Sequence, residues 1–223
     1  MNIAFITARR NSKGLPGKNM LELGGIPLIE HTFKAVVDAD CFDKIYLSTD
    51  IPEAIFIAKK KYKKITVPFK RPKSLSSDNS TQIEVVNHLI SHLQKDNFNF
   101  KNFVLFQPTS PFRSITEIKK GVNLLNSGFE SVIGVSPVMH HPADYVFLEN
   151  NKLKFLMPKY TSMARQNFPD VFFNNGSFYG CSLNFFKKKQ KFYNTNSKLL
   201  VMSNKSLIDI DNSFDFSLAE SFF

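Results

Sequence analysis

The feature that most constrains the fold is a regular alternation of short, β-rich apolar runs with helical stretches of about a dozen residues. The run NIAFITA (2–8) has the length and composition of a buried strand. Apolar residues then recur at helical spacing from 28 to 38, directly behind Pro27, where a first helical turn tolerates proline. Strands and helices in alternation form right-handed βαβ units. The sequence therefore predicts an α/β fold with a doubly wound, mainly parallel sheet.

The same patterns assign each element to a range of the chain. The segment SLIDIDN (Ser206 to Asn212) is expected to form the last strand, followed by a capped terminal helix, and Ser80 or Thr81 can cap the helix that begins at Gln82. The other strands are expected at 2–8, 44–48, 65–67, 102–106, 131–136, 171–179 and 198–202, and the other helices at 28–38, 53–62, 82–93 and 116–126.

The alternation stops between Pro137 and Pro169, in a stretch with four prolines and two histidines. A segment this long without regular structure is uncommon inside a compact domain, and usually has a function of its own. We expect one domain over residues 1–223 that carries an arm at about 137–170, and we expect the arm to pair with a second subunit.

Composition excludes several classes of protein. Apolar residues make up 43% and charged residues 22%, as in soluble globular proteins. No apolar run approaches the roughly 20 residues of a membrane span, and no signal peptide is recognisable, so we expect a cytoplasmic protein with no membrane association. Cys41 and Cys181 form no CxxC or metal-type spacing and are interpreted as reduced thiols.

The formal charge of +10 indicates anionic partners. Much of the charge lies in the lysine runs KKKYKK (59–64) and KKKQK (187–191), which are typical of solvated surfaces. A nucleic-acid-binding protein is the alternative class, and the charge is its whole support. That alternative predicts a steep salt dependence and no use for Asp209 and Asp211.

The loop ITARRNSKGLPGKNM (Ile6 to Met20) follows the first strand, where open α/β sheets commonly bind phosphate. Gly14 and Gly17 would let backbone amides approach an oligophosphate, and Arg9, Lys13 and Lys18 would offset its charge. The loop lacks the spacing of a Walker A motif, which makes a P-loop kinase improbable. Taken alone, it could also be a basic surface turn.

A pair of carboxylates forms the second part of the expected site. In SLIDIDN, Asp209 and Asp211 alternate with Ile208 and Ile210, so a strand would carry both acids on one face, about 7 Å apart. Mg²⁺ binds one or two carboxylates together with substrate phosphates and water. Two solvated acids on an exposed strand are the alternative interpretation. With the cationic loop, the pair indicates a nucleotidyltransferase, in which an acceptor attacks the α-phosphorus of a nucleoside triphosphate and pyrophosphate leaves.

Seven segments in this order resemble the acylneuraminate cytidylyltransferases, also called CMP-sialic acid synthetases. They are ARRNSKGLPGKN, LSTD (47–50), RPKSLSSD (71–78), QPTSPFR (107–113), ARQNFP (164–169), NGSFY (175–179) and SLIDID. The resemblance covers essentially the whole chain. It implies a Rossmann-like nucleotidyltransferase fold, Mg²⁺, a homodimer, and a reaction of CTP with a nine-carbon α-keto sugar acid, a nonulosonic acid, that yields the CMP-sugar and pyrophosphate.

The resemblance also implies roles for individual residues. Arg9, Lys13 and Asp211 would act in catalysis, and the arm would cross to a second subunit to help complete its site. The nucleotide would be bound by Arg9, Ser12, Lys13, Lys18, Asn19, Arg71, Ser80 and Gln82, the sugar acid by Gln107, Arg165 and Tyr179, and the metal by Asp209 and Asp211.

The chain departs from relatives that activate sialic acid at three positions. Asp144 stands where many of them have lysine, Phe173 where some have arginine, and Gln82 where a serine lies near the base. The loss of two cations near a carboxylate substrate makes a relative of sialic acid, such as legionaminic acid, plausible. The eight-carbon acid Kdo, or another sugar acid, is the alternative substrate.

Overall fold

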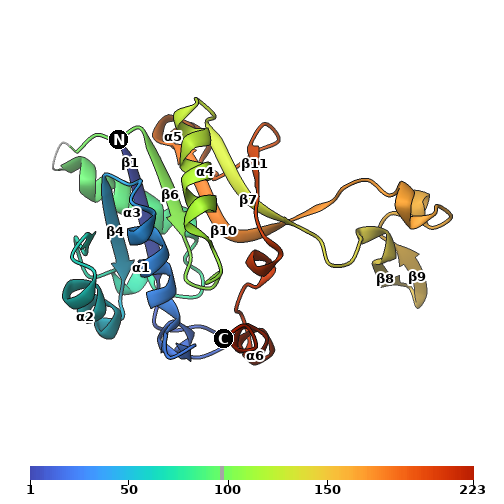
Figure 1. Ribbon diagram of the computed structural model, residues 1–223, viewed down its shortest axis with the longest axis horizontal. Helices are drawn as coiled ribbons and strands as arrows, with labels where there is room; N and C mark the ends of the chain where they lie inside the picture. Colours follow the sequence, from blue (N-terminus) through green and yellow to red (C-terminus); the bar gives the residue numbers. More distant parts are fainter. Residues whose placement is uncertain (96–97) are drawn as a thin grey trace.

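A seven-stranded sheet forms the centre of the protein in the computed structural model, which describes residues 1–95 and 98–223 (Figure 1). The strand order is β11-β7-β10-β6-β1-β4-β5. β1 pairs in parallel with β4 and β6, β4 with β5, and β7 with β11, whereas β10 is antiparallel to both its neighbours. The predicted mainly parallel sheet is confirmed. The strands are β1 (Asn2–Ala8), β4 (Lys44–Thr49), β5 (Ile65–Thr66), β6 (Asn102–Phe106), β7 (Ser131–Pro137), β10 (Phe172–Ser182) and β11 (Lys198–Val201).

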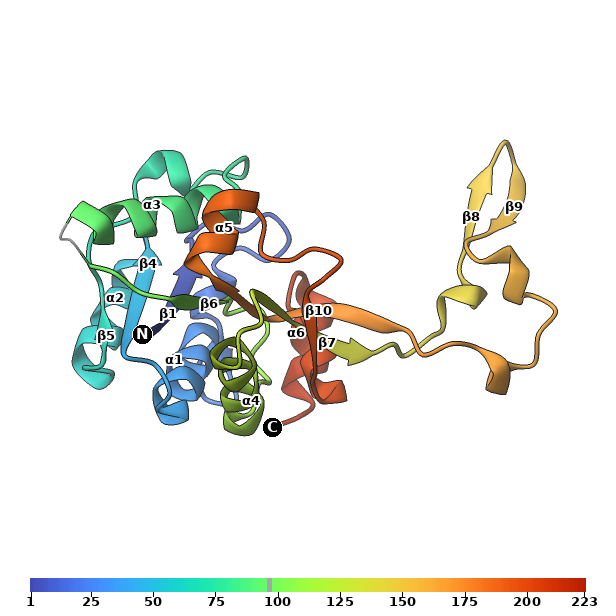
Figure 2. The same ribbon diagram turned by 90° about the horizontal axis from the view of Figure 1, so that it is seen from above.

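Helices cover both faces of this sheet, as the view from above shows (Figure 2). One face packs against α1, α2 and α4, and the other against α3 and α5. The C-terminal helix α6 forms a smaller third cluster. The helices are α1 (Leu28–Ala39), α2 (Pro52–Lys61), α3 (Gln82–Lys95), α4 (Ile115–Asn126), α5 (Leu183–Lys189) and α6 (Ser213–Glu220).

β1 shows why a central strand of this sheet is apolar over its whole length. Ala4 and Ile6 point to the cluster under α1 and α4, whereas Ile3 and Phe5 belong to the cluster under α3. Successive side chains of a strand alternate between the two faces, and here both faces are buried. Phe5 packs on Phe103 of β6, with ring centroids 5.2 Å apart.

Capping residues account for the helix starts. Thr81, and not Ser80, caps α3, because its hydroxyl accepts from the Glu84 amide while the Glu84 carboxylate accepts from the Thr81 amide. Ser80 instead donates its hydroxyl to the Ser74 carbonyl oxygen. Asn212 and Asp215 form the same kind of capping box on α6, so the predicted terminal cap is present.

The predicted strand at 206–212 is wrong. The 3-10 helix η6 (Asn204–Leu207) occupies its start, and the residues after it are extended but lie outside the sheet. Ile210 donates its amide to the Thr109 carbonyl oxygen, 2.8 Å away, in place of a strand ladder. Ile208 and Ile210 are buried against Leu23 and Leu28, so the alternation in the sequence reflects this packing.

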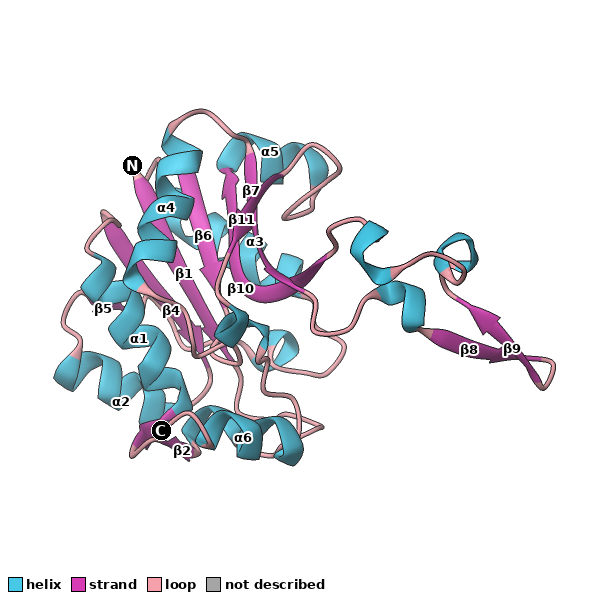
Figure 3. Ribbon diagram, turned by 45° about the vertical axis from the view of Figure 1, so that its right-hand side comes forward, coloured by secondary structure: helices cyan, strands magenta, loops and turns pink. Residues whose placement is uncertain are grey.

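Residues 138–171 form an arm that stands away from the sheet (Figure 3). The arm carries a hairpin of β8 (Val146–Glu149) and β9 (Lys152–Phe155), which the sequence did not predict. Asn150 and Asn151 make its two-residue turn with φ of 52° and 58°, a conformation that asparagine tolerates. The two-stranded sheet of β2 (Glu22–Leu23) and β3 (Ile26–Pro27), and helix α5, were also not predicted.

Within residues 1–95 and 98–223, every helix is too short or too polar to cross a lipid bilayer.

Candidate functional site

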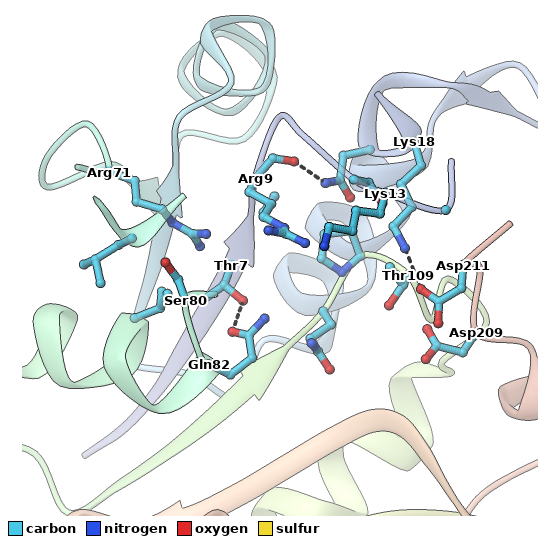
Figure 4. A pocket seen from close by; sticks show the side chains of 18 residues that line it. Thr7, Arg9, Lys13, Lys18, Arg71, Ser80, Gln82, Thr109, Asp209 and Asp211 are labelled. Atoms are coloured by element: carbon cyan, nitrogen blue, oxygen red, sulfur yellow. Dashed lines mark hydrogen bonds and ion pairs between the residues drawn. The ribbon is translucent and has the colours of Figure 1, made fainter. Parts of the chain in front are cut away.

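A pocket of about 430 Å³ opens at the carboxyl ends of β1 and β6 (Figure 4). Ligands of open α/β sheets settle at this edge because the loops that leave parallel strands converge there. The lining residues are Thr7, Ala8, Arg9, Ser12, Lys13, Gly14, Lys18, Asn19, Arg71, Leu75, Ser80, Gln82, Val85, Gln107, Pro108, Thr109, Asp209 and Asp211.

The pocket brings together most of the residues that the sequence singled out. All eight residues expected at the nucleotide line it, together with both aspartates and Gln107. Arg165 and Tyr179 do not. Tyr179 lies half-buried in β10, where its ring stacks on Tyr193 with centroids 6.2 Å apart and burial raises the pKa of its hydroxyl.

The two predicted motifs are in direct contact. Gly14 lies so close to the backbone of Asp211 that a Cβ at this position would collide with the Asp211 carbonyl oxygen. Gly17 has a φ of 67°, a left-handed conformation that glycine adopts without strain, and it leads into the 3-10 helix η1 (Lys18–Met20). The glycines thus serve two purposes, close packing at residue 14 and a turn at residue 17.

Lys18 connects the loop to the carboxylates. Its ammonium group is buried and donates to the Ile210 carbonyl oxygen and to Asp211 Oδ1, each at 2.7 Å. A buried lysine needs such partners, because an unpaired charge in the interior is costly. This contact sets the position of Asp211 relative to the cationic loop.

Asp209 has a carboxyl oxygen that is available to bind a metal ion. Its Oδ1 atom is buried without a hydrogen-bond partner among the described residues. Burial raises the pKa of this carboxyl, Asp211 adds to the rise, and a hydrogen bond with the Thr109 side chain opposes it. A buried carboxylate oxygen without a partner, in a pocket that a second carboxylate also lines, fits a hard divalent cation. Because the described residues contain no cluster of three or more potential metal-binding side chains, an ion here would need further ligands from substrate and water.

The opposite end of the pocket is polar. Arg71 is buried, and its guanidinium donates to the hydroxyl and carbonyl oxygens of Ser48 at 3.1 and 2.9 Å. Burial lowers its pKa to about 10. The Thr7 hydroxyl donates to the side-chain carbonyl oxygen of Gln82 at 3.0 Å, so the side-chain nitrogen of Gln82 takes no part in this hydrogen bond. Arg71, Ser80 and Gln82 lie together at this end in Figure 4.

Arg9 and Lys13 lie between the two ends (Figure 4). Arg9 Nη1 donates to the Ser77 carbonyl oxygen at 2.7 Å and pairs with Asp78 Oδ1 at 2.9 Å. Lys13 Nζ lies 3.6 Å from Asp78 Oδ2. The Asn19 side chain donates to the Arg9 carbonyl oxygen at 2.9 Å, which steadies the backbone of the loop.

Arg113 has a structural contact network and does not line the pocket. It is buried, and burial lowers its pKa to about 9. It donates to the carbonyl oxygens of Ser177 and Gln107, at 3.0 and 2.6 Å, and to the Thr32 hydroxyl at 2.8 Å. Its place directly after the QPTSPF run was the only sign in the sequence that it supports the loop of Gln107.

The sequence did not indicate that Thr7 and Thr109 line the pocket, or that Asp78 pairs with two of its cations. Thr109 could have been found, since it lies in the same motif as Gln107. Asp78 ends the RPKSLSSD motif, but nothing in that motif indicates that its carboxylate reaches Arg9 and Lys13.

The arm has a hollow of its own, of about 400 Å³. Arg165 lines it, and its Nη2 atom is 3.5 Å from Asp144 Oδ2. His141 also lines this hollow, with Nε2 3.2 Å from the Pro169 carbonyl oxygen. The hollow shares no lining residue with the pocket of the sheet.

Comparison with known proteins identifies the family. Residues 3–209 match the family model described as Cytidylyltransferase. The chain is 33% identical over 222 residues to the CMP-N,N'-diacetyllegionaminic acid synthase of Legionella pneumophila, covering 98% of this chain and 94% of that protein. It is 30% identical to an N-acylneuraminate cytidylyltransferase of Streptococcus agalactiae, covering 96% of this chain and 51% of that longer protein.

A solved structure shares the fold. The CMP:2-keto-3-deoxy-manno-octonic acid synthetase in complex with CTP superposes with a TM-score of 0.70 at 11% identity, over 99% of this chain and 97% of the other. The resemblance to the acylneuraminate cytidylyltransferases is confirmed, and the nucleic-acid-binding alternative is set aside. The chain belongs to the cytidylyltransferase family, and it is a nucleotidyltransferase that uses CTP.

Proposed function

We propose that the enzyme activates a nonulosonic acid with CTP, giving the CMP-sugar and pyrophosphate. The observation that carries this proposal is the order of groups along the pocket. A polar end with the buried Arg71, and with Ser80 and Gln82, suits a nucleoside, and a carboxylate pair suits a metal. The cations of the loop lie between them, where a triphosphate would extend (Figure 4).

The side chains have distinct roles in this proposal. Arg9, Lys13 and Lys18 offset the charge of the triphosphate, Ser12 and Asn19 offer hydrogen bonds to it, and Asp209 with Asp211 hold Mg²⁺. When bound, Mg²⁺ neutralises charge on the phosphates as pyrophosphate departs.

Gln107 positions the sugar acid at the base of the pocket. The anomeric hydroxyl gives its proton to water and its oxygen bonds to the α-phosphorus, while the bond from this phosphorus to the bridging oxygen breaks and pyrophosphate leaves with that oxygen. Alignment of the two reactants accounts for much of the rate.

The sugar is proposed to be legionaminic acid or a sialic acid, with Kdo as the alternative. The name of the Legionella relative supports the first, since that protein matches over nearly its full length. The test is pyrophosphate release with CTP and Mg²⁺, offering N,N'-diacetyllegionaminic, N-acetylneuraminic and Kdo acids in parallel. Release with a nine-carbon acid supports the proposal. Release with Kdo alone, or with none of the three despite CTP binding, contradicts the proposed substrate class.

We assign the reaction to the cytoplasm, where CTP is made. The two free thiols are consistent with a reducing compartment, because Cys181 is buried, Cys41 is half-buried, and burial raises the pKa of Cys41 to about 11. A thiol with a raised pKa is poorly reactive and needs no disulfide partner.

The arm is proposed to pair with a second copy of the chain. Its hairpin exposes apolar side chains on both strands, with Leu148 73% and Leu153 62% exposed. Such surfaces mark interaction sites. An apolar hollow of about 580 Å³ at the base of the arm includes Phe173, Asp209 and Asp211. A partner's arm in this hollow would lie beside the nucleotide pocket.

Leu148→Asp is expected to convert a dimer into monomers, because burying a carboxylate in an apolar interface is costly. Size-exclusion chromatography with light scattering measures the mass directly. Phe56→Asp is the matched control, since Phe56 is 63% exposed on α2, away from the arm. A wild-type chain that is monomeric at micromolar concentration would contradict the dimer.

Arg165→Ala is expected to raise KM for the sugar acid about ten- to hundredfold and to leave KM for CTP unchanged, because a charge-assisted contact with the sugar carboxylate is lost. Lys188→Ala, which removes an exposed cation from α5, controls for net charge.

A mixing experiment tests whether Arg165 acts across subunits. Arg165→Ala and Asp211→Ala are mixed and allowed to exchange subunits at low sugar concentration. If the arm serves the partner's pocket, hybrid dimers contain one intact site and activity appears that neither parent has. No recovery from confirmed hybrids would contradict action across subunits.

A further inference from the structure

Asp78 pairs with two cations that line the pocket, Arg9 and Lys13. Its Oδ1 atom is 2.9 Å from Arg9 Nη1 and its Oδ2 atom is 3.6 Å from Lys13 Nζ. One carboxylate therefore spans both cations, one oxygen to each. This is the arrangement that two phosphate oxygens would take up between the same side chains.

Each cation of the loop is thus paired with an acid of the same chain. Lys18 pairs with Asp211 at the metal end, and Arg9 and Lys13, which line the middle of the pocket (Figure 4), both pair with Asp78. The two acids differ in one respect. Asp211 can share its charge with Mg²⁺, whereas Asp78 lies away from the aspartate pair and has no such partner when a triphosphate arrives.

Asp78 is also held loosely. Its side chain is 38% exposed, and that of Lys13 is 78% exposed. Exposed ion pairs contribute little to stability and exchange readily. The carboxylate can turn into solvent, and repulsion from the phosphates would drive it there.

We propose that Asp78 is a positioning residue that holds Arg9 and Lys13 at the phosphate site in the free enzyme and is displaced by the triphosphate of CTP. This inference rests on the proposed function. Displacement of Asp78 opposes nucleotide binding, so the residue sets the affinity for CTP. The loss of nucleotide affinity that Asp78 causes therefore increases with the number of phosphates that reach Arg9 and Lys13.

The test is Asp78→Asn, with dissociation constants for CMP, CDP and CTP measured by calorimetry. The amide keeps the shape but not the charge. We expect CTP to bind about three- to tenfold tighter than to the wild type, CDP less so, and CMP nearly unchanged. The difference should shrink in high salt. Asp78→Glu, which keeps the charge, should resemble the wild type.

Glu53→Gln is the matched control. Glu53 pairs with Arg10 Nη2 at 2.7 Å in the same loop, and Arg10 does not line the pocket, whereas Arg9 and Lys13 do. Equal tightening by both variants would indicate a general charge effect and overturn the proposal. Unchanged or weaker CTP binding by Asp78→Asn, with an unchanged melting temperature, would also overturn it. If the wild type binds no CTP at all, the proposed function fails too. If CTP binds tightly and substitution of residue 78 does not change its affinity, only this inference is overturned.

Discussion

Asp211→Ala is expected to lower kcat/KM by about a thousandfold, because metal-assisted charge neutralisation contributes several kcal/mol and about 1.4 kcal/mol corresponds to tenfold in rate. The variant loses one of the two carboxylates of the metal pair. It also leaves the buried ammonium of Lys18 with the Ile210 carbonyl oxygen as its one remaining hydrogen-bond partner among the described residues. Pyrophosphate release over a series of Mg²⁺ concentrations measures the effect.

The control for Asp211→Ala is Asp38→Ala, which removes an exposed carboxylate that pairs with Lys34 on α1. Its activity should equal that of the wild type. Isothermal titration of CTP with and without Mg²⁺ separates the two effects of the Asp211 substitution, since loss of the metal removes only the Mg²⁺-dependent part of binding. Near wild-type turnover with an unchanged Mg²⁺ requirement would show that Asp211 is not a metal ligand.

Arg113→Met is expected to destabilise the fold by about 3 to 4 kcal/mol, since removal of one partner from a buried charged network leaves groups unsatisfied. The carbonyl oxygens of Ser177 and Gln107 and the hydroxyl of Thr32 would lose their donor. Urea unfolding gives the free energy of unfolding directly.

Two further variants sharpen the test of Arg113. Arg113→Lys keeps the charge, but one ammonium group cannot reproduce the fork of a guanidinium, so we expect it to recover only part of the stability. Arg10→Ala removes an exposed arginine of the loop and should change the free energy of unfolding by less than about 1 kcal/mol. A loss below that value for Arg113→Met would mean that the buried network is not important for stability.

The local pattern of the sequence was sufficient to predict where most helices and strands lie. In 2–8 and 102–106 the predicted bounds are those of β1 and β6, because a run buried on both faces is apolar throughout and ends where polar loop residues begin. The helical period gave α1 and α4 to within a residue at each end. The direction of β10 was not readable, because an antiparallel strand buried on both faces has the same composition as a parallel one.

The segment around Asp209 shows where local pattern misleads. Alternation of isoleucine and aspartate predicts a strand, yet the isoleucines alternate because they pack under α6, and the segment makes no ladder. The sequence predicted that the two carboxylates lie on the same side of this segment. That prediction needs an extended segment, but it does not need the segment to be a strand of the sheet. Both aspartates therefore line the pocket although the strand is absent.

By itself, the sequence determined the α/β class, the cationic loop, the carboxylate pair and the family, since each of these depends on residues that are close together in the chain or on their order. Tertiary structure alone decided that Gly14 packs on the backbone of Asp211, that Asp78 spans Arg9 and Lys13, and that Arg113 donates to the Gln107 carbonyl oxygen. The physical reason is separation along the chain. Contacts between residues far apart are selected by how the helices and loops pack on the finished sheet, and no periodicity in the sequence records that choice.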